Sequence, residues 1–408
     1  MNTAQRQAVP LGLAALLALL SMISPFSIDT FFPSFRAMQA EFDVSALTMQ
    51  QTLTAYMIPY AIMSLVHGPL SDALGRRVVV IWGLMLYALA SLACTFSSSF
   101  AALLVFRALQ GMTAGAGLTV GRAIVRDLYE GPEAQRLMNA VTMIFSVAPA
   151  LAPVLGGWIH AVFGWRAVFF FLFALGVAIV LASWWRLPET LPPQRRMPLA
   201  LGPLVRTTAR ILANREFLTM SVAAGFNMGA VLFFIGSAPS IVLDDWHLSE
   251  TQFHWLFVPV IGGFLVGAIL SGRMAGRVPS ARQVRFGYLS TAFGSGCAAL
   301  LHATWPGGPP ILLQQLLMAV GSVGVQLVFP VLTLRILDMF PASRGAAASA
   351  QTFVQLLVAS SMMGLAVPML GGALQWVTLC SALAALTSLL LWTLASRMLA
   401  RRGVVAQH

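Results

Sequence analysis

The chain has 408 residues, of which 58% are hydrophobic and only 9% are charged. An ordinary soluble domain carries about 25% charged residues, so this chain lacks the charges for a water-soluble surface, and most of its surface must face lipid. The formal net charge is +11, and every basic residue is an arginine. The arginines stand in short clusters between long apolar runs, a pattern that favours membrane topology over nucleic-acid binding.

Twelve apolar segments are long enough to cross a bilayer, which takes about 20 mainly apolar residues per helix. The first of them is too long for the core of a signal peptide, and no small-residue cleavage site follows it. We therefore expect an all-helical integral membrane protein. The expected spans are 11–35, 48–70, 78–97, 100–122, 136–160, 166–186, 216–240, 251–272, 284–304, 309–334, 345–370 and 373–396.

The arginines alternate between the two sides of these spans. If the N-terminus lies inside, the outer loops hold only Arg36 and Arg166 and carry acids such as Asp244 and Glu250. Because cytoplasmic loops are enriched in Lys and Arg, we expect both termini in the cytoplasm. The arginines of the expected inner side are Arg76, Arg77, Arg126, Arg136, Arg195, Arg196, Arg206, Arg210, Arg215, Arg273, Arg277, Arg282, Arg285, Arg344, Arg397, Arg401 and Arg402.

A long polar segment divides the chain into two halves. Residues 1–186 are expected to form one six-helix bundle, 187–215 a cytoplasmic linker, and 216–408 a second bundle with a short tail. The string Pro153-Val-Leu-Gly-Gly in the fifth span is echoed by Pro368-Met-Leu-Gly-Gly at the end of the eleventh, although coincidence in Gly/Pro-rich apolar sequence is the alternative. Repeated halves are typical of secondary transporters, whose site lies near the midplane between them.

Two ionisable side chains lie deep inside the expected spans. Asp29 is the only carboxylate there, and Arg107 is the only deeply placed arginine, since Arg122 and Arg335 lie near cytoplasmic ends. Asp29 and Arg107 each stand seven residues from the outer end of their span, which places both roughly 10 Å below the outer edge. A carboxylate facing an arginine can exchange its proton for substrate, as proton coupling requires; a static ion pair is the alternative.

The loop between the second and third spans reads Gly68-Pro-Leu-Ser-Asp72-Ala-Leu-Gly75-Arg76-Arg77. We expect Gly68 to let helices approach closely, and Asp72 to pair with an arginine or cap a helix end. Gly75 should make the turn tight, while the two arginines hold the loop at the inner surface. These residues are candidates for an inner gate.

This loop resembles the signature G-x-L-x-D-x-x-G-R-[RK] of the major facilitator superfamily. The string Arg107-Ala-Leu-Gln-Gly resembles the fourth-helix motif of that superfamily. The fifth span, with Pro149, Pro153, Gly156 and Gly157, is similar to its antiporter motif G-x-x-x-G-P-x-x-G-G, with alanine at both early glycines. The resemblance implies two pseudo-symmetric six-helix bundles around a cavity lined by spans one and four, and transport in the direction of export.

Three further strings resemble the Bcr/CflA branch of drug exporters: Ser27-Ile-Asp-Thr-Phe-Phe-Pro33, Arg122-Ala-Ile-Val-Arg-Asp-Leu-Tyr129 and Glu189-Thr-Leu-Pro-Pro-Gln-Arg-Arg196. The resemblance covers most of the first half and departs from the branch at Phe31, where many relatives have tyrosine. It implies a monomer of the bacterial inner membrane that needs no cofactor. Its implied activity is the exchange of protons for small molecules such as bicyclomycin, chloramphenicol, sulfonamides or metabolites.

Other polar residues within the spans are candidates for lining a substrate cavity, although each can instead bond a neighbouring helix. Alternative functions are a proton-coupled importer, a transporter of one nucleoside, amino acid or peptide derivative, a membrane enzyme and a sensor. The sequence contains no clustered nucleophile and base, no metal-ligand spacing among its histidines and no signalling domain. The candidates are Gln51, Tyr56, Tyr60, Asn139, Asn227, Gln326, Gln351 and Gln355.

Overall fold

The computed structural model describes residues 11–129, 131–305, 308–369 and 374–401, and these ranges contain helices and turns but no strand. Twelve of the helices have 18 or more residues, and each overlaps one of the twelve expected spans. They are α1 (Leu11–Asp29), α3 (Ala46–Ser64), α5 (Arg76–Thr95), α6 (Phe100–Leu128), α7 (Gly131–Phe163), α8 (Trp165–Arg186), α10 (Arg215–Gly236), α11 (His254–Met274), α12 (Ser280–Thr304), α13 (Ile311–Asp338), α14 (Arg344–Ser361) and α16 (Leu374–Arg401).

Eight helices of the described chain are long and apolar enough to cross a membrane by length and composition. The remaining four long helices are α3, α12 and α14, which carry more polar residues, and α7, whose segment Val147–Phe163 is apolar but shorter. Three of them, α3, α7 and α14, pack at the boundary between the halves, where polar side chains need not face lipid. The all-helical membrane fold is confirmed, and the count of twelve spans is consistent with it but stays a prediction.

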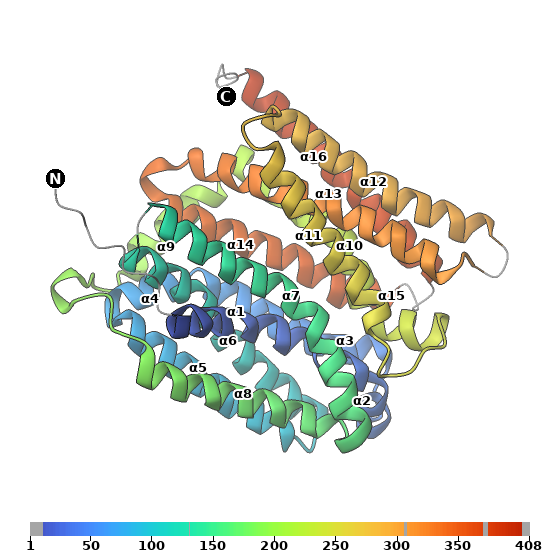
Figure 1. Cartoon of the computed structure of the whole chain (residues 1–408), viewed down its shortest axis with the longest axis horizontal. Helices are drawn as coiled ribbons and strands as arrows, with labels where there is room; N and C mark the ends of the chain where they lie inside the picture. Colours follow the sequence, from blue (N-terminus) through green and yellow to red (C-terminus); the bar gives the residue numbers. More distant parts are fainter. Residues whose placement is uncertain (1–10, 130, 306–307, 370–373, 402–408) are drawn as a thin grey trace.

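The helix packing of the first half recurs in the second (Figure 1). Helix α1 packs on α7 as α10 packs on α14, and α3 packs on α6 as α11 packs on α13. Helix α5 likewise lies between α6 and α8, as α12 lies between α13 and α16. Contacts across the boundary are reciprocal too, because α3 meets α14 while α11 meets α7. This is the packing of two pseudo-symmetric bundles.

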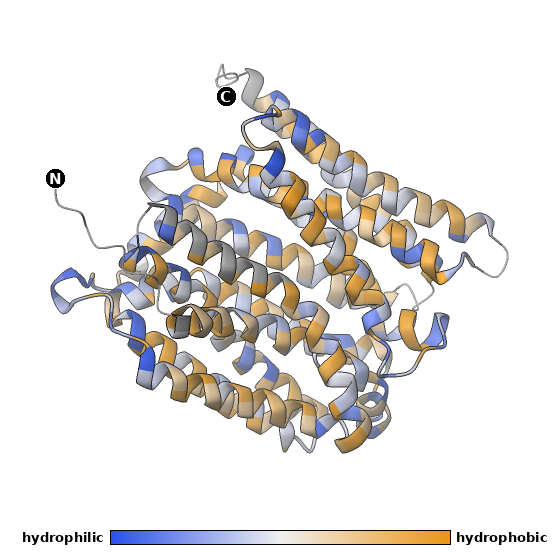
Figure 2. Ribbon diagram, viewed as in Figure 1, coloured by the Kyte–Doolittle hydropathy of each residue, from blue (hydrophilic) through white to orange (hydrophobic). Residues whose placement is uncertain are grey.

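Apolar side chains cover the outside of the bundle. Trp82, Leu86 and Leu89 on α5, and Phe293 and Leu300 on α12, are all more than half exposed. Figure 2 shows hydrophobic residues along the lengths of the helices, while many hydrophilic ones lie at helix ends and in loops. Exposing so large an apolar surface to water is unfavourable, whereas contact between this surface and the hydrocarbon of a bilayer carries no free-energy penalty.

Several expected spans consist of more than one helical piece. A break after α1 leaves Asp29 at the end of that helix. The echo of the fifth-span motif at Gly371 and Gly372 lies outside the described residues. The additional pieces are the turn Phe32–Ser34 and α2 (Phe35–Phe42) after α1, α4 (His67–Leu74) after α3, the π turn Ser240–Asp245 after α10, and the π turn Met362–Ala366 with α15 (Val367–Met369) after α14.

The segment expected as a linker contains a helix that the sequence analysis did not predict, α9 (Leu201–Leu212). It packs on α10 and α14, and its residue Ile211 is buried in the second half. The limits of the two halves at 186 and 216 stay a prediction. We call the end of the molecule with α4 and α9 the linker end, and the opposite end, with α2, the far end (Figure 1).

The two halves share a core at the far end but not at the linker end. One buried cluster runs from Leu16 of the first half to Val377 of the second, and its members from the second half lie toward the far end. A separate cluster, with Phe217, Tyr288 and Ile336, fills the linker end of the second half alone. The halves are therefore joined by packing at the far end and leave room between them at the linker end.

Candidate functional site

Polar contacts close the far end between the halves. Arg36 on α2 forms an ion pair with Asp244 in the turn after α10. Deeper in the bundle, the Gln50 side-chain Nε2 donates to the carbonyl oxygen of Gly236 at 2.9 Å. Both contacts join residues about two hundred positions apart in the sequence, so they depend on the two halves being pressed together.

The two glycines of the antiporter-like motif also lie at the far end. Gly156 on α7 abuts the backbone carbonyl of Thr30, at the end of α1, and Gly157 abuts the backbone of Glu250 in the second half. The Glu250 carboxylate in turn lies 3.2 Å from His160 Nε2. A side chain at either glycine would collide with backbone. The motif therefore combines close packing within the first half with close packing between the halves.

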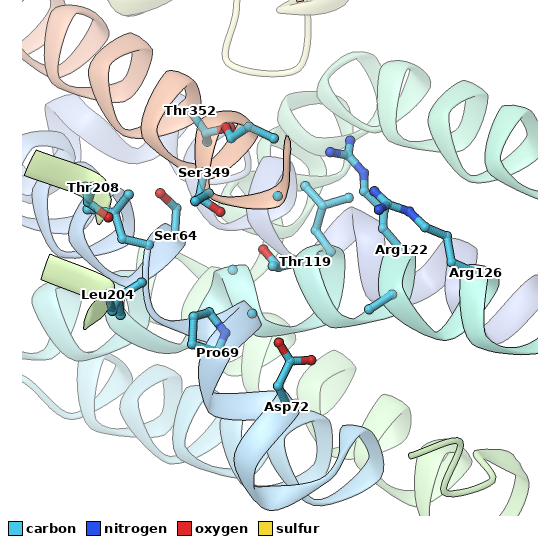
Figure 3. Close-up of a pocket in the computed structure, with 18 of the residues that line it drawn as sticks. Ser64, Pro69, Asp72, Thr119, Arg122, Arg126, Leu204, Thr208, Ser349 and Thr352 are labelled. Carbon is cyan, nitrogen blue, oxygen red and sulfur yellow. The ribbon is translucent and has the colours of Figure 1, made fainter. Parts of the chain in front are cut away.

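A cavity of about 430 Å³ lies between the halves at the linker end (Figure 3). We call it the linker-end cavity. Residues of α3, α4, α6, α9 and α14 line it, so both halves contribute to its wall. Its size falls within the range of small-molecule sites. Polar residues that line it include Ser64, Asp72, Thr119, Arg122, Ser349 and Thr352.

The expected gating loop forms one wall of this cavity around Arg76. The Arg76 guanidinium lies 2.5 Å from Asp72 and 3.1 Å from Asp127 on α6, so one arginine bridges two carboxylates. Asp72 thus pairs with an arginine, as predicted. Arg77 points the other way and donates to the Trp184 carbonyl at 2.6 Å, at the end of α8. The loop is therefore held to α6 and α8 by its two arginines.

The two glycines of the loop differ in role. Gly75 has φ +107° and ψ +149°, a conformation open essentially to glycine alone, and a Cβ there would meet the Glu189 carboxylate. The predicted tight turn is therefore confirmed. Gly68 has nothing within 4 Å of a Cβ position and lines the cavity instead. The expectation that Gly68 allows close helix approach was wrong, because no neighbouring helix lies against it.

Arg107 is fully buried at the meeting point of α1, α3 and α6. Its Nη1 donates to the Ser27 carbonyl at 3.0 Å and to Gln110 Oε1 at 2.9 Å. Its Nε donates to the Thr52 carbonyl at 3.3 Å. The guanidinium also lies between two aromatic rings, 4.4 Å from the centre of Phe31 and 4.6 Å from that of Tyr56. Such contacts fix the charge in place.

Gln110, one turn from Arg107, extends this network toward α5. Its Nε2 donates to Ser91 Oγ at 2.8 Å while its Oε1 accepts from Arg107. The Ser27 hydroxyl lies 2.6 Å from the Tyr87 hydroxyl, so α1 and α5 are joined as well. The sequence marked Gln110 only through a motif, because its hydrogen-bond partners are 16 or more residues away or on its own helix.

Asp29 is buried, with 5% of its surface exposed, and within the described chain it forms no ion pair and no hydrogen bond through its side chain. The expected pairing with Arg107 is not formed in this conformation. The Ser27 and Thr52 carbonyls and the Gln110 side chain accept from Nε and Nη1 of Arg107, while its buried Nη2 has no hydrogen-bond partner among the described residues. Both side chains are buried in the protein, whereas their depth in the membrane and their role in coupling stay predictions.

The other polar residues predicted to line a substrate cavity lie in different parts of the molecule. Only Tyr60 lines the linker-end cavity; Tyr56 stacks on Tyr60 with ring centres 6.0 Å apart and does not line it. The side chain of Asn139 lies outside the described residues, and the roles of all eight stay predictions. Of the rest, Gln51 donates to the Gly364 carbonyl, Gln351 donates to Thr333, Gln326 lies against Gly267, and Asn227 and Gln355 each have a buried polar atom without a partner among the described residues.

The charged face of the cavity was not predicted from the sequence. Gly115, Thr119, Arg122 and Arg126 on α6 all line it. Their spacing of four, three and four residues puts them on one side of a helix, and that periodicity was the available signal. Arg122 had been expected simply to reach the membrane interface. In the described residues, no group of three or more His, Cys, Asp or Glu side chains is placed to hold a metal ion.

Known proteins with similar sequences are transporters. The chain is 34% identical over 303 residues to the uncharacterized MFS-type transporter YdgK of Bacillus subtilis, covering 73% of this chain and 74% of that one. It is 28% identical over 295 residues to a bicyclomycin resistance protein homolog of Haemophilus influenzae, with 71% and 74% covered. It is 33% identical over 281 residues to a chloramphenicol resistance protein of Pseudomonas aeruginosa, with 68% and 66% covered.

The fold is likewise that of known transporters. The crystal structure of a D-xylose-proton symporter matches with a TM-score of 0.69 and 15% identity, covering 93% of this chain and 97% of that one. The sequence profile described as "Major Facilitator Superfamily" matches residues 17–363. The family resemblance drawn from the loop at Gly68–Arg77 is thus confirmed over most of the chain. This multi-pass membrane protein belongs to the Major Facilitator Superfamily, whose members are transporters and not enzymes.

Proposed function

We propose that this protein exports small drug-like molecules or metabolites across the bacterial inner membrane in exchange for protons. The names of the bicyclomycin and chloramphenicol resistance relatives support a drug substrate, and the antiporter-like motif on α7 supports export. The transporter works as a monomer, and the proton gradient takes the place of a cofactor. Its linker end faces the cytoplasm, because the arginine clusters lie there.

The conformation of the molecule is one in which an exporter would take up its substrate. With the far end closed and the linker-end cavity between the halves, a molecule from the cytoplasm can enter the cavity, whereas one from outside cannot. Export then requires the far-end contacts to open and the linker end to close. In this alternating cycle, the proton must be taken up when the far end is open and released when the linker end is open.

The observation that carries the proposal is the buried carboxylate of Asp29. Ionisable side chains inside a membrane protein are costly and are kept where they serve transport. Asp29 lies where α1 ends, one residue before the Thr30 carbonyl that contacts the α7 motif, so its proton can respond to movement at the far end. No described residue forms an ion pair with Asp29, so protonation of its carboxylate is the simplest way to neutralise the buried charge.

Transport by purified protein in proteoliposomes with an imposed pH gradient tests the proposal, with chloramphenicol and bicyclomycin as the substrates. Asp29→Asn should abolish gradient-driven uphill transport and weaken binding of these neutral molecules much less. Arg107→Ala should damage the same step, and the double variant should be little worse than either single one. Asp43→Asn is the matched control, since it removes an exposed far-end charge at a left-handed position that Asn tolerates.

Two results would overturn the proposal. If Asp29→Asn still supports uphill, proton-dependent transport at rates near those of the unchanged protein, Asp29 is not the coupling residue. If the unchanged protein accumulates the substrate on the side toward which the protons flow, the protein is a proton-coupled importer.

A further inference from the structure

Two arginines on one face of α6 point into the linker-end cavity without a counter-charge. Arg122 and Arg126 both line the cavity, and both are exposed to it. Neither forms a hydrogen bond or an ion pair with any other residue in the described part of the chain. Like charges four residues apart on a helix repel each other, so this arrangement costs stability unless an anion lies between them.

The acids of the cavity do not supply that anion. Asp72 and Asp127 are both engaged by Arg76, at 2.5 Å and 3.1 Å. Asp127 also accepts a hydrogen bond from the Thr190 hydroxyl at 2.9 Å. Of the charged side chains that line the cavity, Arg122 and Arg126 are therefore the ones left without compensation, and the cavity carries a net positive charge.

Hydroxyl groups line the same cavity as the two arginines. Thr119 lies on α6 one turn before Arg122 and faces the same cavity. Figure 3 shows Ser349 and Thr352 on α14, on the other side of the cavity from Asp72. The Thr352 hydroxyl donates to its own helix, to the Ala348 carbonyl at 3.0 Å, so its proton is not available to a ligand in this conformation. Both halves thus bring polar groups to the place where the arginines lie.

We propose that the linker-end cavity binds the carboxylate or phosphate group of an anionic small molecule through Arg122 and Arg126. A guanidinium pairs with such groups through two parallel hydrogen bonds, and Thr119 and Ser349 are placed to donate further ones. A volume of about 430 Å³ admits one small molecule, not a polymer. The inference rests on the proposed transport function and narrows its substrates to a class that includes acids.

The same chemistry has a second source, the phosphate of a lipid headgroup from the inner leaflet. The location favours a soluble anion, because Thr119 and Ser349 come from different halves and the cavity lies between those halves and not on the lipid-facing side. A merely positive cytoplasmic surface would also attract anions. Such a surface would respond equally to the loss of any two exposed arginines at the linker end.

The experiment measures equilibrium binding of radiolabelled 4-nitrobenzoate and of its neutral isostere 4-nitrobenzamide to the full chain in phosphatidylcholine nanodiscs, with no gradient. We expect saturable binding of the benzoate and at least tenfold weaker binding of the benzamide. Arg122→Gln/Arg126→Gln should weaken benzoate binding at least tenfold and leave benzamide binding unchanged. Arg277→Gln/Arg282→Gln, which removes two exposed arginines away from the cavity, is the matched control and should bind like the unchanged protein.

Three outcomes would overturn the inference. Equal binding of benzoate and benzamide would mean that the charge is not recognised. Equal losses in both double-arginine variants would show general surface attraction. The site would be a lipid site if two results came together. The protein in phosphatidylcholine nanodiscs would not bind benzoate, and it would bind phosphatidylglycerol saturably in a way that depends on Arg122. Because no gradient is used, a failure of proton-driven export leaves these binding results intact, and the two proposals fail separately.

Discussion

Gly157 of α7 lies directly against the backbone carbonyl of Glu250, and this contact joins two residues from opposite halves of the molecule. Backbone cannot move aside as a flexible side chain can. A methyl group at position 157 should therefore push the halves apart at the far end. The glycine pair of the α7 motif is thus a place where a minimal change tests whether far-end closure controls transport.

Opening of the far end can be measured with a single cysteine, introduced by Gln51→Cys into a variant without the three native cysteines. Gly157→Ala should raise the rate at which a membrane-impermeant maleimide labels this cysteine. Gln51 donates to the Gly364 carbonyl where α3 meets the second half, so its accessibility reports on closure. A tenfold rise corresponds to a shift of about 1.4 kcal/mol in the opening equilibrium. Gly262→Ala, where a Cβ meets nothing within 4 Å, is the control; equal labelling of both would contradict the prediction.

The ion pair between Arg36 and Asp244 should contribute little to closure. Both side chains are about half exposed, at 49% and 54%, and exposed pairs are worth roughly 0.2–1 kcal/mol. Arg36→Ala and Asp244→Ala should each change transport less than about fivefold, and a double-mutant cycle should give a coupling energy below about 1 kcal/mol. A loss greater than tenfold from either change would show that this pair, and not the glycine packing, holds the far end closed.

Replacing each of the two glycines of the gating loop with alanine should have a different effect on the stability of the protein. Gly75→Ala forces a side chain into a conformation reserved for glycine and against Glu189, which should cost about 1–3 kcal/mol. Gly68→Ala meets open space on a helix and should be neutral or slightly stabilising. Thermal unfolding in detergent measures both variants. A Gly68→Ala protein that melts as low as Gly75→Ala would contradict the assignment of the turn to Gly75 alone.

Arg107→Lys should abolish transport even though the charge is kept. The guanidinium reaches three acceptors on α1, α3 and α6 and lies between two rings, and a lysine ammonium cannot reproduce that geometry. We expect transport to fall at least tenfold in an inserted, purifiable protein, measured in the same proteoliposomes. Arg282→Lys on the exposed surface is the control. Transport near the unchanged rate in Arg107→Lys would show that only the charge at this position matters.

The orientation of the chain gives a test that is independent of transport. A reporter active only in the cytoplasm should be active when fused to the C-terminus, because the arginine clusters belong on that side. A reporter active only outside the cytoplasm should be active when inserted beside Asp244. Reversal of either result would refute the arginine-based orientation and, with it, the assignment of the linker end to the cytoplasm.

Local features of the structure could be predicted from the sequence because their causes are local. Each long apolar run produced a long helix, although some ends differ from the expected limits by six to nine residues, as at Asp29, Leu128 and Ser361. The glycine before Arg76 produced the turn that its left-handed backbone requires. Arg76 pairs with Asp72, four residues earlier, across the turn at Gly75. In each case, the residues that make the feature are neighbours in the chain.

The features that escaped prediction depend on distant residues. The partners of Arg107 are mostly backbone carbonyls, which every residue carries and no sequence pattern marks. Asp127 pairs with Arg76, 51 residues earlier, across two helices. Helix α9 was hidden because its proline and two arginines resemble a polar loop, whereas its apolar side packs on α10 and α14. The cavity exists only once both halves are placed together.

The segment that connects the halves is held to the first half near its start and to the second half near its end, with very few residues between these two anchor points. Glu189 accepts from the Arg76 backbone and Met197 donates to the Asp72 carbonyl, so the start of the segment is tied to the first half. Helix α9, from Leu201 on, is tied to the second. Only three residues lie between, about 10 Å of chain when fully extended. This tether limits how far the halves can travel apart at the linker end before one of its anchors must release.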